Sequence, residues 1–139
     1  MTTVRVFRGS QQSPRQHAHG IKTAALVTPV DGEGWLCGIS VYAPGTAAPP
    51  HSHNCGEQIV ILEGSAELCV GDQRWTLHGH DSGWIGAGLE HSYRNIGEGD
   101  LRLLWLYDRP DAMRTSGASG QTVPLINLEE FLAPKREVP

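Results

Sequence analysis

The sequence is poor in cysteine, and the spacing of the few cysteines argues against two common kinds of site. Among 139 residues there are only Cys37, Cys55 and Cys69, and no two of them form a Cys-x-x-Cys pair. An odd number with this spacing disfavours both a disulfide framework and a cysteine zinc site. Such cysteine usage fits a reducing compartment, so we expect a cytoplasmic protein.

Long apolar runs and clusters of basic residues are also missing. No stretch approaches the roughly 18 uninterrupted apolar residues of a membrane-spanning helix, and residues 1–8 lack the apolar segment of a secretion signal. Lysine and arginine total 11 against 15 acidic residues, and the net charge is −4. Because nucleic-acid backbones require a clustered basic face, we expect neither nucleic acid nor a membrane as a partner.

Glycine and proline, by contrast, are abundant, with 17 and 9 residues. This excess argues against a helix bundle and favours short strands joined by tight turns. Residues 43–50, which include Pro49 and Pro50, are expected to be irregular or edge-like because proline cannot donate to a strand ladder. The sequence predicts an all-β antiparallel sandwich or barrel. Alternating or β-branched apolar residues predict strands at 4–7, 21–30, 34–43, 57–63, 65–70, 74–78, 82–85, 91–96 and 101–107.

Three parts are expected along the chain: an N-terminal strand and loop at 1–20, the barrel at 21–110, and a flexible C-terminal tail at 111–139. The tail is expected to hold one short helix that begins at Asn127, a capping residue, and ends before Pro134. The strand at 4–7 would expose unpaired edges, and exposed edges are usually covered. We therefore expect it to pair with a second copy of the chain in a homodimer.

The histidines, seven in number, are the most informative residues. His51 and His53 are two residues apart, so on an extended chain both side chains point to one face. Glu57 follows within a short turn, and His91 comes from a later segment. Three imidazoles and one carboxylate make a site for a divalent ion such as Fe, Zn, Mn or Ni, with coordination positions left open for a substrate.

Two sequence motifs contain these residues. The first, G-x5-H-x-H-x3-E-x6-G, is matched in full by Gly45, His51, His53, Glu57 and Gly64. The second, G-x5-P-x-G-x2-H-x3-N, is matched at Gly88, His91 and Asn95, whereas His80 and Gly86 stand where glycine and proline are expected. In both motifs the chain resembles the cupin superfamily, over about residues 34–107.

The resemblance implies a double-stranded β-helix, or jelly roll, in a single-domain cupin of a kind that is often dimeric. It makes His51, His53, Glu57 and His91 the ligands of one divalent transition metal per chain. Glu57 and Tyr93 are the candidate catalytic residues. Tyr93 shares strand parity with His91, so we expect it to face the metal and to donate a proton or a hydrogen bond. A core tyrosine with a satisfied hydroxyl is the alternative.

Other residues have plainer expected roles. The pair His17/His19 lies in a polar loop and the pair His78/His80 at a turn, so both are expected on the surface, although entry of either pair into the pocket stays open. Cys55 is expected to be a small buried thiol. Of the four tryptophans, at least one is expected to line the cavity.

The expected pocket is largely apolar, because Ile59 and Ile61 share the parity of Glu57. Such a pocket suits a small organic substrate with an enolisable carbonyl or an aromatic ring. We expect a metal-dependent enzyme of the cyclase, isomerase or lyase type that uses Lewis-acid and acid–base chemistry. Single-domain cupins of this size resemble small polyketide cyclases. Two alternatives stay open: an Fe(II) dioxygenase that uses O2, and a non-catalytic module that binds a small ligand.

Overall fold

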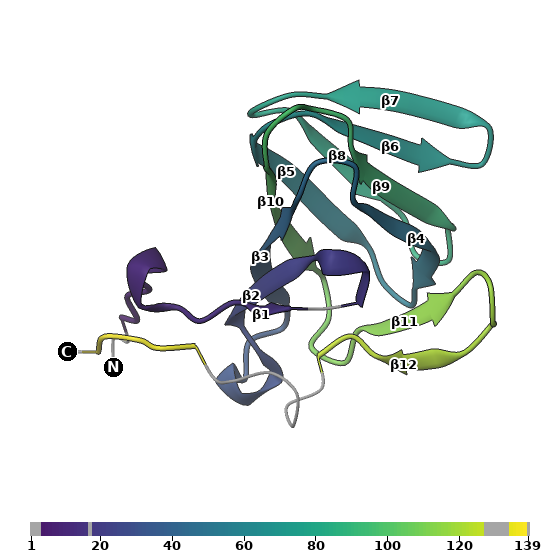
Figure 1. Ribbon diagram of the computed structural model, residues 1–139. Coiled ribbons are helices and arrows are strands. Elements are labelled where there is room, and N and C mark those ends of the chain that lie inside the picture. Colours follow the sequence, from purple (N-terminus) through teal and green to yellow (C-terminus); the bar gives the residue numbers. More distant parts are fainter. Residues whose placement is uncertain (1–3, 17, 127–133, 139) are drawn as a thin grey trace.

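The computed structural model describes residues 4–16, 18–126 and 134–138, and within them two six-stranded antiparallel sheets pack face to face (Figure 1). The first sheet has the strand order β1-β2-β3-β10-β5-β8, and the second has the order β12-β11-β4-β9-β6-β7. The prediction of an all-β, double-sheet jelly roll is confirmed. No helix in these ranges is long and apolar enough to cross a membrane.

Most strands expected between residues 21 and 107 are present, with bounds that differ by a few residues. The first sheet contains β1 (Arg15–Gln16), β2 (Lys22–Val27), β3 (Leu36–Tyr42), β5 (Glu57–Glu63), β8 (Ser82–Ile85) and β10 (Leu101–Tyr107). The second contains β4 (Ala47–His53), β6 (Ala66–Val70), β7 (Gln73–Leu77), β9 (His91–Asn95), β11 (Met113–Ser116) and β12 (Thr122–Pro124). Short 3-10 turns are η1 (Gly9–Gln11), η2 (Ala18–Gly20) and η3 (Pro29–Asp31).

Alternating side chains of the central strands form the core. On β5, Ile59 and Ile61 are fully buried, while Gln58 and Val60 are only partly buried. Burial with a period of two is the pattern of a strand that has one face against a core. The same alternation turns Glu57, at the start of β5, toward the interior, where its side chain is buried.

Strand β4 crosses Pro49 and Pro50 without leaving the sheet, which corrects the expectation of an irregular segment at 43–50. It lies between β11 and β9, and its register with β9 shifts across the two prolines. A bulge of this kind accommodates residues that cannot donate to the ladder. Beyond the prolines, His51 pairs directly with His91. The two histidines therefore lie side by side on adjacent strands.

A hairpin of β11 and β12 extends the second sheet where the sequence predicts a flexible tail. Strand β11 pairs with β4, and the Gly117 N–H donates to the carbonyl oxygen of Pro50 at 2.9 Å. Residues 117–120 form the loop of this hairpin, and residues 113–124 are thus part of the sheet. The short helix predicted from Asn127 lies outside the described residues.

The N-terminal strand predicted at 4–7 is reduced to one isolated bridge within the chain. The Val6 N–H donates to the carbonyl oxygen of Glu137, and the Glu137 N–H donates to that of Val6, both at 2.9 Å. In Figure 1 the purple N-terminal segment and the yellow C-terminal segment run side by side. The backbone groups of Val6 therefore need no partner subunit, and the homodimer stays a prediction.

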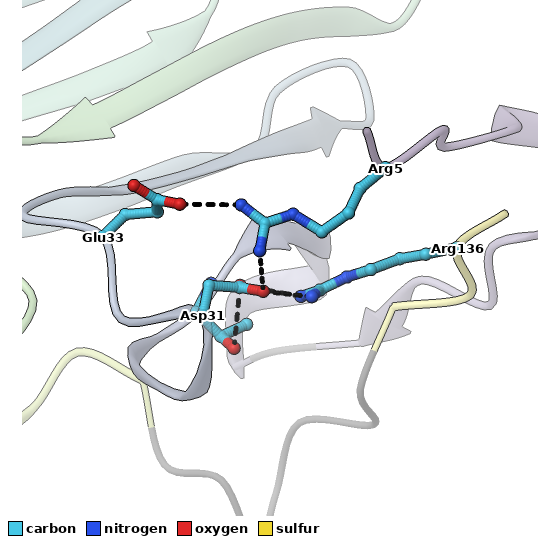
Figure 2. Close-up of polar contacts among 5 residues, drawn as sticks. Arg5, Asp31, Glu33 and Arg136 are labelled. Carbon is cyan, nitrogen blue, oxygen red and sulfur yellow. Dashed lines mark hydrogen bonds and ion pairs between the residues drawn. The ribbon is translucent and has the colours of Figure 1, made fainter. Parts of the chain in front are cut away.

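An ion-pair cluster around Asp31, which we call the terminal clamp, holds both of these segments (Figure 2). The Asp31 side chain is only 2% exposed. Arg136 contacts both of its carboxylate oxygens, with Nη2 2.7 Å from Oδ2. Nη1 of Arg5 lies 3.4 Å from Oδ1 of Asp31, and Nη2 of Arg5 lies 2.8 Å from Oε1 of Glu33. One buried carboxylate thus ties the two ends of the described chain to the turn before β3.

The ionisation of Asp31 depends on these contacts. Burial by itself raises the pKa of this carboxyl group, but the hydrogen bonds from Arg136 and the Thr28 amide, with the charges of Arg136 and Arg5, outweigh burial and lower the pKa. A pKa that is lower in the folded than in the unfolded chain stabilises the fold at neutral pH.

Asp31→Asn is expected to destabilise the fold by about 2 kcal/mol at neutral pH, because it leaves two arginines without their buried counter-ion. The contribution of Asp31 is fully present above its unfolded pKa of about 3.9, and it is lost as the pH falls through the lowered folded pKa. Urea unfolding at neutral pH and near pH 3 measures both effects, and the difference from wild type should shrink at the lower pH. Glu33→Gln is the matched control, because Glu33 is 41% exposed. Equal losses in the two variants would contradict a special role for the buried carboxylate.

Candidate metal centre

The four residues singled out by the two motifs meet between the sheets. Strand β4 carries His51 and His53, β9 carries His91, and β5 of the opposite sheet carries Glu57. One potential ligand atom from each residue can be chosen so that all four atoms lie within 4.8 Å of one another. All four residues are buried, with exposed fractions from 1% to 4%. They therefore form one cluster that joins the two sheets.

Backbone carbonyl groups hold the three histidine rings in one tautomer. A carbonyl oxygen only accepts hydrogen bonds, so each Nδ1 that contacts one carries the proton, and in a neutral ring Nε2 keeps its lone pair. Outer contacts of this kind fix the orientation of metal-binding histidines in general. The Nδ1 atoms lie 2.7–3.0 Å from the carbonyl oxygens of Pro49 for His51, Met113 for His53 and Leu89 for His91.

The inner sides of the rings face a carboxylate rather than a hydrogen-bond donor. Nε2 of His53 lies 3.1 Å from Oε2 of Glu57, and Nε2 of His91 lies 3.2 Å from the same oxygen. Nε2 of His53 is buried and has no hydrogen bond of proper geometry in the described part of the chain. It is therefore an unsatisfied buried atom that points at the cluster.

The charge states of the cluster also fit a cation. Burial lowers the pKa of His51 to about 3, so this ring is neutral at physiological pH. Burial by itself raises the pKa of Glu57, but a positive charge on the Nε2 side of His53 and His91, whether a proton or a metal ion, outweighs burial and lowers the pKa to about 2. A lone pair and an ionised carboxylate that face one another are stabilised by a positive ion between them. The donor set, three imidazoles and one carboxylate, is suited to a divalent transition metal.

The other carboxylate oxygen of Glu57 accepts a hydrogen bond from a tyrosine. The hydroxyl of Tyr93 donates a hydrogen bond to Oε1 of Glu57. Burial and the nearby Glu57 carboxylate raise the pKa of Tyr93 far above its ordinary value, so the hydroxyl keeps its proton. The structure thus brings Tyr93 to the cluster, on the inward parity of β9 that it shares with His91.

Tyr107 is a neighbour of the cluster that sequence reasoning missed. Its ring centroid lies 4.7 Å from that of His53, and burial together with the Glu57 carboxylate raises its pKa well above the ordinary value. In the sequence, Tyr107 alternates with Trp105 on the inward face of β10. An ordinary core residue shows the same alternation, so the pattern did not mark Tyr107 as part of the site.

A cavity of about 310 Å³ reaches the cluster and has mostly apolar and aromatic walls. Ile59 and Ile61, which were expected in its wall, are instead fully buried core residues and are not part of it. Trp105 is the tryptophan in the wall, and its indole N–H donates to Ser40 at 3.0 Å. The apolar and aromatic wall residues are Ile21, Tyr42, Ala48, Pro49, Tyr93, Leu103, Trp105, Tyr107, Val123, Pro124, Leu125 and Ile126.

The remaining histidines and Cys55 have separate positions. His78 and His80 are exposed, as expected, whereas His19 is exposed but also contributes to the cavity wall. His17 lies outside the described residues. Cys55 is buried, and burial with the nearby Asp108 charge raises the pKa of its thiol to about 11, which makes it unreactive.

His80 shows why the second motif has glycine at its position. Its φ of 74° lies in the left-handed region, which glycine adopts without strain. The matching motif glycines Gly45, Gly64 and Gly88 also have positive φ values, of 77°, 90° and 80°. The departure from the motif therefore changes the residue but keeps the backbone turn.

His80→Gly is expected to stabilise the fold by about 0.5–1 kcal/mol, because relief of the left-handed strain exceeds the added entropy of the unfolded chain. The shift of the urea midpoint measures this gain. His80→Ala keeps the strain and serves as the control that should show no gain. A less stable glycine variant would mean that the imidazole of His80 contributes more than its backbone costs.

Two facing antiparallel sheets around a buried cluster of three histidines and one glutamate define a cupin barrel. The chain belongs to the Cupin_2 family, because the family model, described as a cupin domain, matches residues 38–107. This match runs from within β3 to the end of β10 and includes all four residues of the cluster.

Several named proteins are similar to this chain. Auxin-binding protein 1 of Arabidopsis thaliana is 28% identical in an alignment of 101 positions that covers 66% of this chain and 46% of that protein. The chain thus spans about half the length of that curated relative. A predicted oxalate decarboxylase from Thermotoga maritima has a TM-score of 0.68 at 21% identity, covering 75% of this chain and 98% of that one. The oxalate decarboxylase of Lactobacillus farciminis, in a formate complex, has a TM-score of 0.69 at 20% identity, covering 78% and 34%. At these identities the two solved structures show a common fold.

Proposed function

We propose that the protein is a metal-dependent cupin enzyme that acts on a small, largely apolar or aromatic organic substrate by Lewis-acid and acid–base chemistry. The reaction would be of the cyclase, isomerase or lyase type. One observation supports this above the others. A tyrosine hydroxyl is bonded to Glu57 beside three imidazoles whose Nδ1 atoms are tied to the backbone. The names of the relatives, an auxin-binding protein and oxalate decarboxylases, also concern small organic molecules.

His51, His53, Glu57 and His91 would hold the divalent ion, with Zn, Fe, Mn and Ni as the metals suited to these donors. A bound divalent ion supplies positive charge that polarises a substrate carbonyl or lowers the pKa of bound water. The carbonyl contacts at each Nδ1 hold the rings in position in advance, so little side-chain freedom is lost on binding.

Tyr93 and Glu57 would carry out the acid–base chemistry on the substrate. Glu57, ionised beside a positive charge, would loosen from the ion and accept a proton from the carbon next to a substrate carbonyl. Tyr93 keeps its own proton, and once Glu57 is protonated its hydroxyl would turn from Oε1 of Glu57 to the oxygen on which negative charge develops. The aromatic and apolar walls keep water away from this charge, which strengthens both interactions.

Exchange of substrate protons for deuterons tests this chemistry before a product is known. Zinc-loaded protein, which is redox-inert, would be incubated without oxygen in D2O with a panel of small enolisable ketones and 1,3-diketones, and exchange followed by NMR. We expect exchange at the carbon next to the carbonyl for at least one compound. The exchange should fall at least about tenfold in Tyr93→Phe and Glu57→Gln. Tyr42→Phe is the control, because Tyr42 is another tyrosine of the cavity wall.

The other functions give different results in the same assay. Oxygen uptake that needs iron, with no exchange in the zinc form, would contradict the proposal and favour an Fe(II) dioxygenase. Binding of panel compounds without exchange or oxygen uptake would favour a non-catalytic ligand-binding cupin. Metal content is measured for each variant, so that loss of the ion is separated from loss of the proton-handling group.

A further inference from the structure

A positively charged side chain faces the same cavity from outside the family match. Arg114 lies on β11, beyond residues 38–107, and pairs directly with His53 on β4. Directly paired residues in an antiparallel sheet place their side chains on the same face. Since His53 points into the barrel, Arg114 also points inward, and both residues are part of the cavity wall.

Arg114 has no counter-ion among the described residues. Other arginines of the described chain, such as Arg74, Arg94 and Arg109, form ion pairs with carboxylates. Arg114 forms neither an ion pair nor a side-chain hydrogen bond with a described residue, and it is partly buried. A guanidinium group that has lost part of its hydration is stabilised by an anion, and a carboxylate matches its two-pronged geometry.

The carboxylate already present in the cavity wall does not serve as that partner. Glu57 is the acidic residue of the described wall, and no ion pair joins it to Arg114, because its two oxygens face Tyr93 on one side and His53 and His91 on the other. Among the described residues the rest of the wall is mostly apolar and aromatic, so a ligand that fills the cavity meets Arg114 as the one guanidinium there without an ion pair.

We propose that Arg114 anchors the carboxylate of the substrate, and that this substrate is a small aromatic or apolar carboxylic acid. The acid group would bind Arg114 while the remainder lies along the apolar wall toward the histidine cluster. A cavity of about 310 Å³ is at the small end of ligand sites, which suits an acid with one ring. This inference rests on the proposed function, because it assigns the substrate class of the same site.

Matched pairs of acids and amides test the anchor. The probes are benzoate, phenylacetate and 3-phenylpropanoate, each compared with its primary amide by isothermal titration calorimetry. Both the metal-loaded and the chelator-treated protein are titrated. We expect at least one acid to bind at least about tenfold more tightly than its amide, as a charge-assisted hydrogen bond provides. Arg114→Gln should remove this preference, and Arg114→Lys should restore part of it.

Arg102→Gln is the control for total charge, because Arg102 is exposed on β10 and pairs with Glu63. It should keep the preference for acids. The anchor assignment is wrong if no acid binds better than its amide to the wild type, or if Arg114→Gln keeps the preference. A preference that disappears on chelation but survives in Arg114→Gln would assign the carboxylate to the metal instead.

The same titrations separate this inference from the proposed function. If no divalent ion can be loaded but the preference for acids is present and depends on Arg114, the anchor stands and the metal-dependent function fails. If the ion loads at His51, His53, Glu57 and His91 but no preference is seen, the anchor alone fails.

Discussion

Wild-type protein is expected to bind about one divalent ion per chain, and the double variant His51→Ala/His53→Ala is expected to bind none. The two residues supply half of the buried cluster, and without them the remaining imidazole and carboxylate do not enclose an ion. Elemental analysis of purified and metal-reloaded protein measures the stoichiometry.

Thermal unfolding gives a second readout that needs no substrate. The cluster takes three histidines from one sheet and Glu57 from the other, so a bound ion would link the two sheets. At a free metal concentration of 100 times Kd, binding adds about 2.7 kcal/mol of stability, and the Tm of a domain of this size should rise by roughly 10 °C. The double variant should show no rise.

His78→Ala/His80→Ala is the matched control for these measurements. It removes a second His-x-His pair that is exposed and lies outside the cluster. This variant should bind metal like the wild type. Retention of a full equivalent of metal by the His51/His53 variant, or failure to load any first-row metal into the wild type, would refute the assignment of the site.

Gly38→Ala is expected to destabilise the fold by about 3 kcal/mol, because the added methyl group has no room in the core. A Cβ at this position would lie 2.2 Å from the Trp105 ring and 2.6 Å from the carbonyl oxygen of Ala24. Trp105 is 6% exposed and held by its hydrogen bond to Ser40, and the Ala24 oxygen belongs to the backbone, so neither neighbour can move away cheaply.

Gly56→Ala makes an informative contrast, because its overlap is equally severe but the overlapping side chain is exposed to solvent. The added Cβ would lie 2.1 Å from the ring of Trp84, which is 56% exposed and can swing outward. We expect a loss of less than about 1 kcal/mol. Gly34→Ala, which meets no atom within 4 Å, should be neutral. Urea unfolding ranks the three variants, and similar losses at positions 38 and 56 would show that the Trp105 side chain is not the constraint.

The four residues of the cluster could be predicted from the sequence because their signals are local. His51, His53 and Glu57 lie within seven consecutive positions, and the alternation of a strand turns all three inward. Tyr93 could be found in the same way, since its parity matches that of His91 on β9. Strand parity depends only on near neighbours in the chain, so it can be read before the fold is known.

The groups that support the cluster could not be predicted, because they come from strand pairing over long distances. The carbonyl oxygen that holds His53 belongs to Met113, and the inward position of Arg114 follows from the register of β11 with β4. Strands β11 and β12 are short and mostly polar, and residues 117–120 between them resemble a flexible segment. Nothing in their local pattern shows that the edge of β4 is available to them.

The terminal clamp and the Val6–Glu137 bridge beside it are expected to form late in folding. Val6 and Glu137 enclose nearly the whole chain, and closing a loop of that length in an unfolded chain costs on the order of 4 kcal/mol of entropy. A single bridge and partly exposed arginine contacts stabilise the closed loop by less than this entropic cost. The two sheets must therefore assemble first and bring the segments together, after which the clamp forms at small entropic cost. By the same reasoning the clamp is expected to open before the two sheets separate, and the amides of residues 4–8 and 134–138 should exchange hydrogen sooner than those of the central strands.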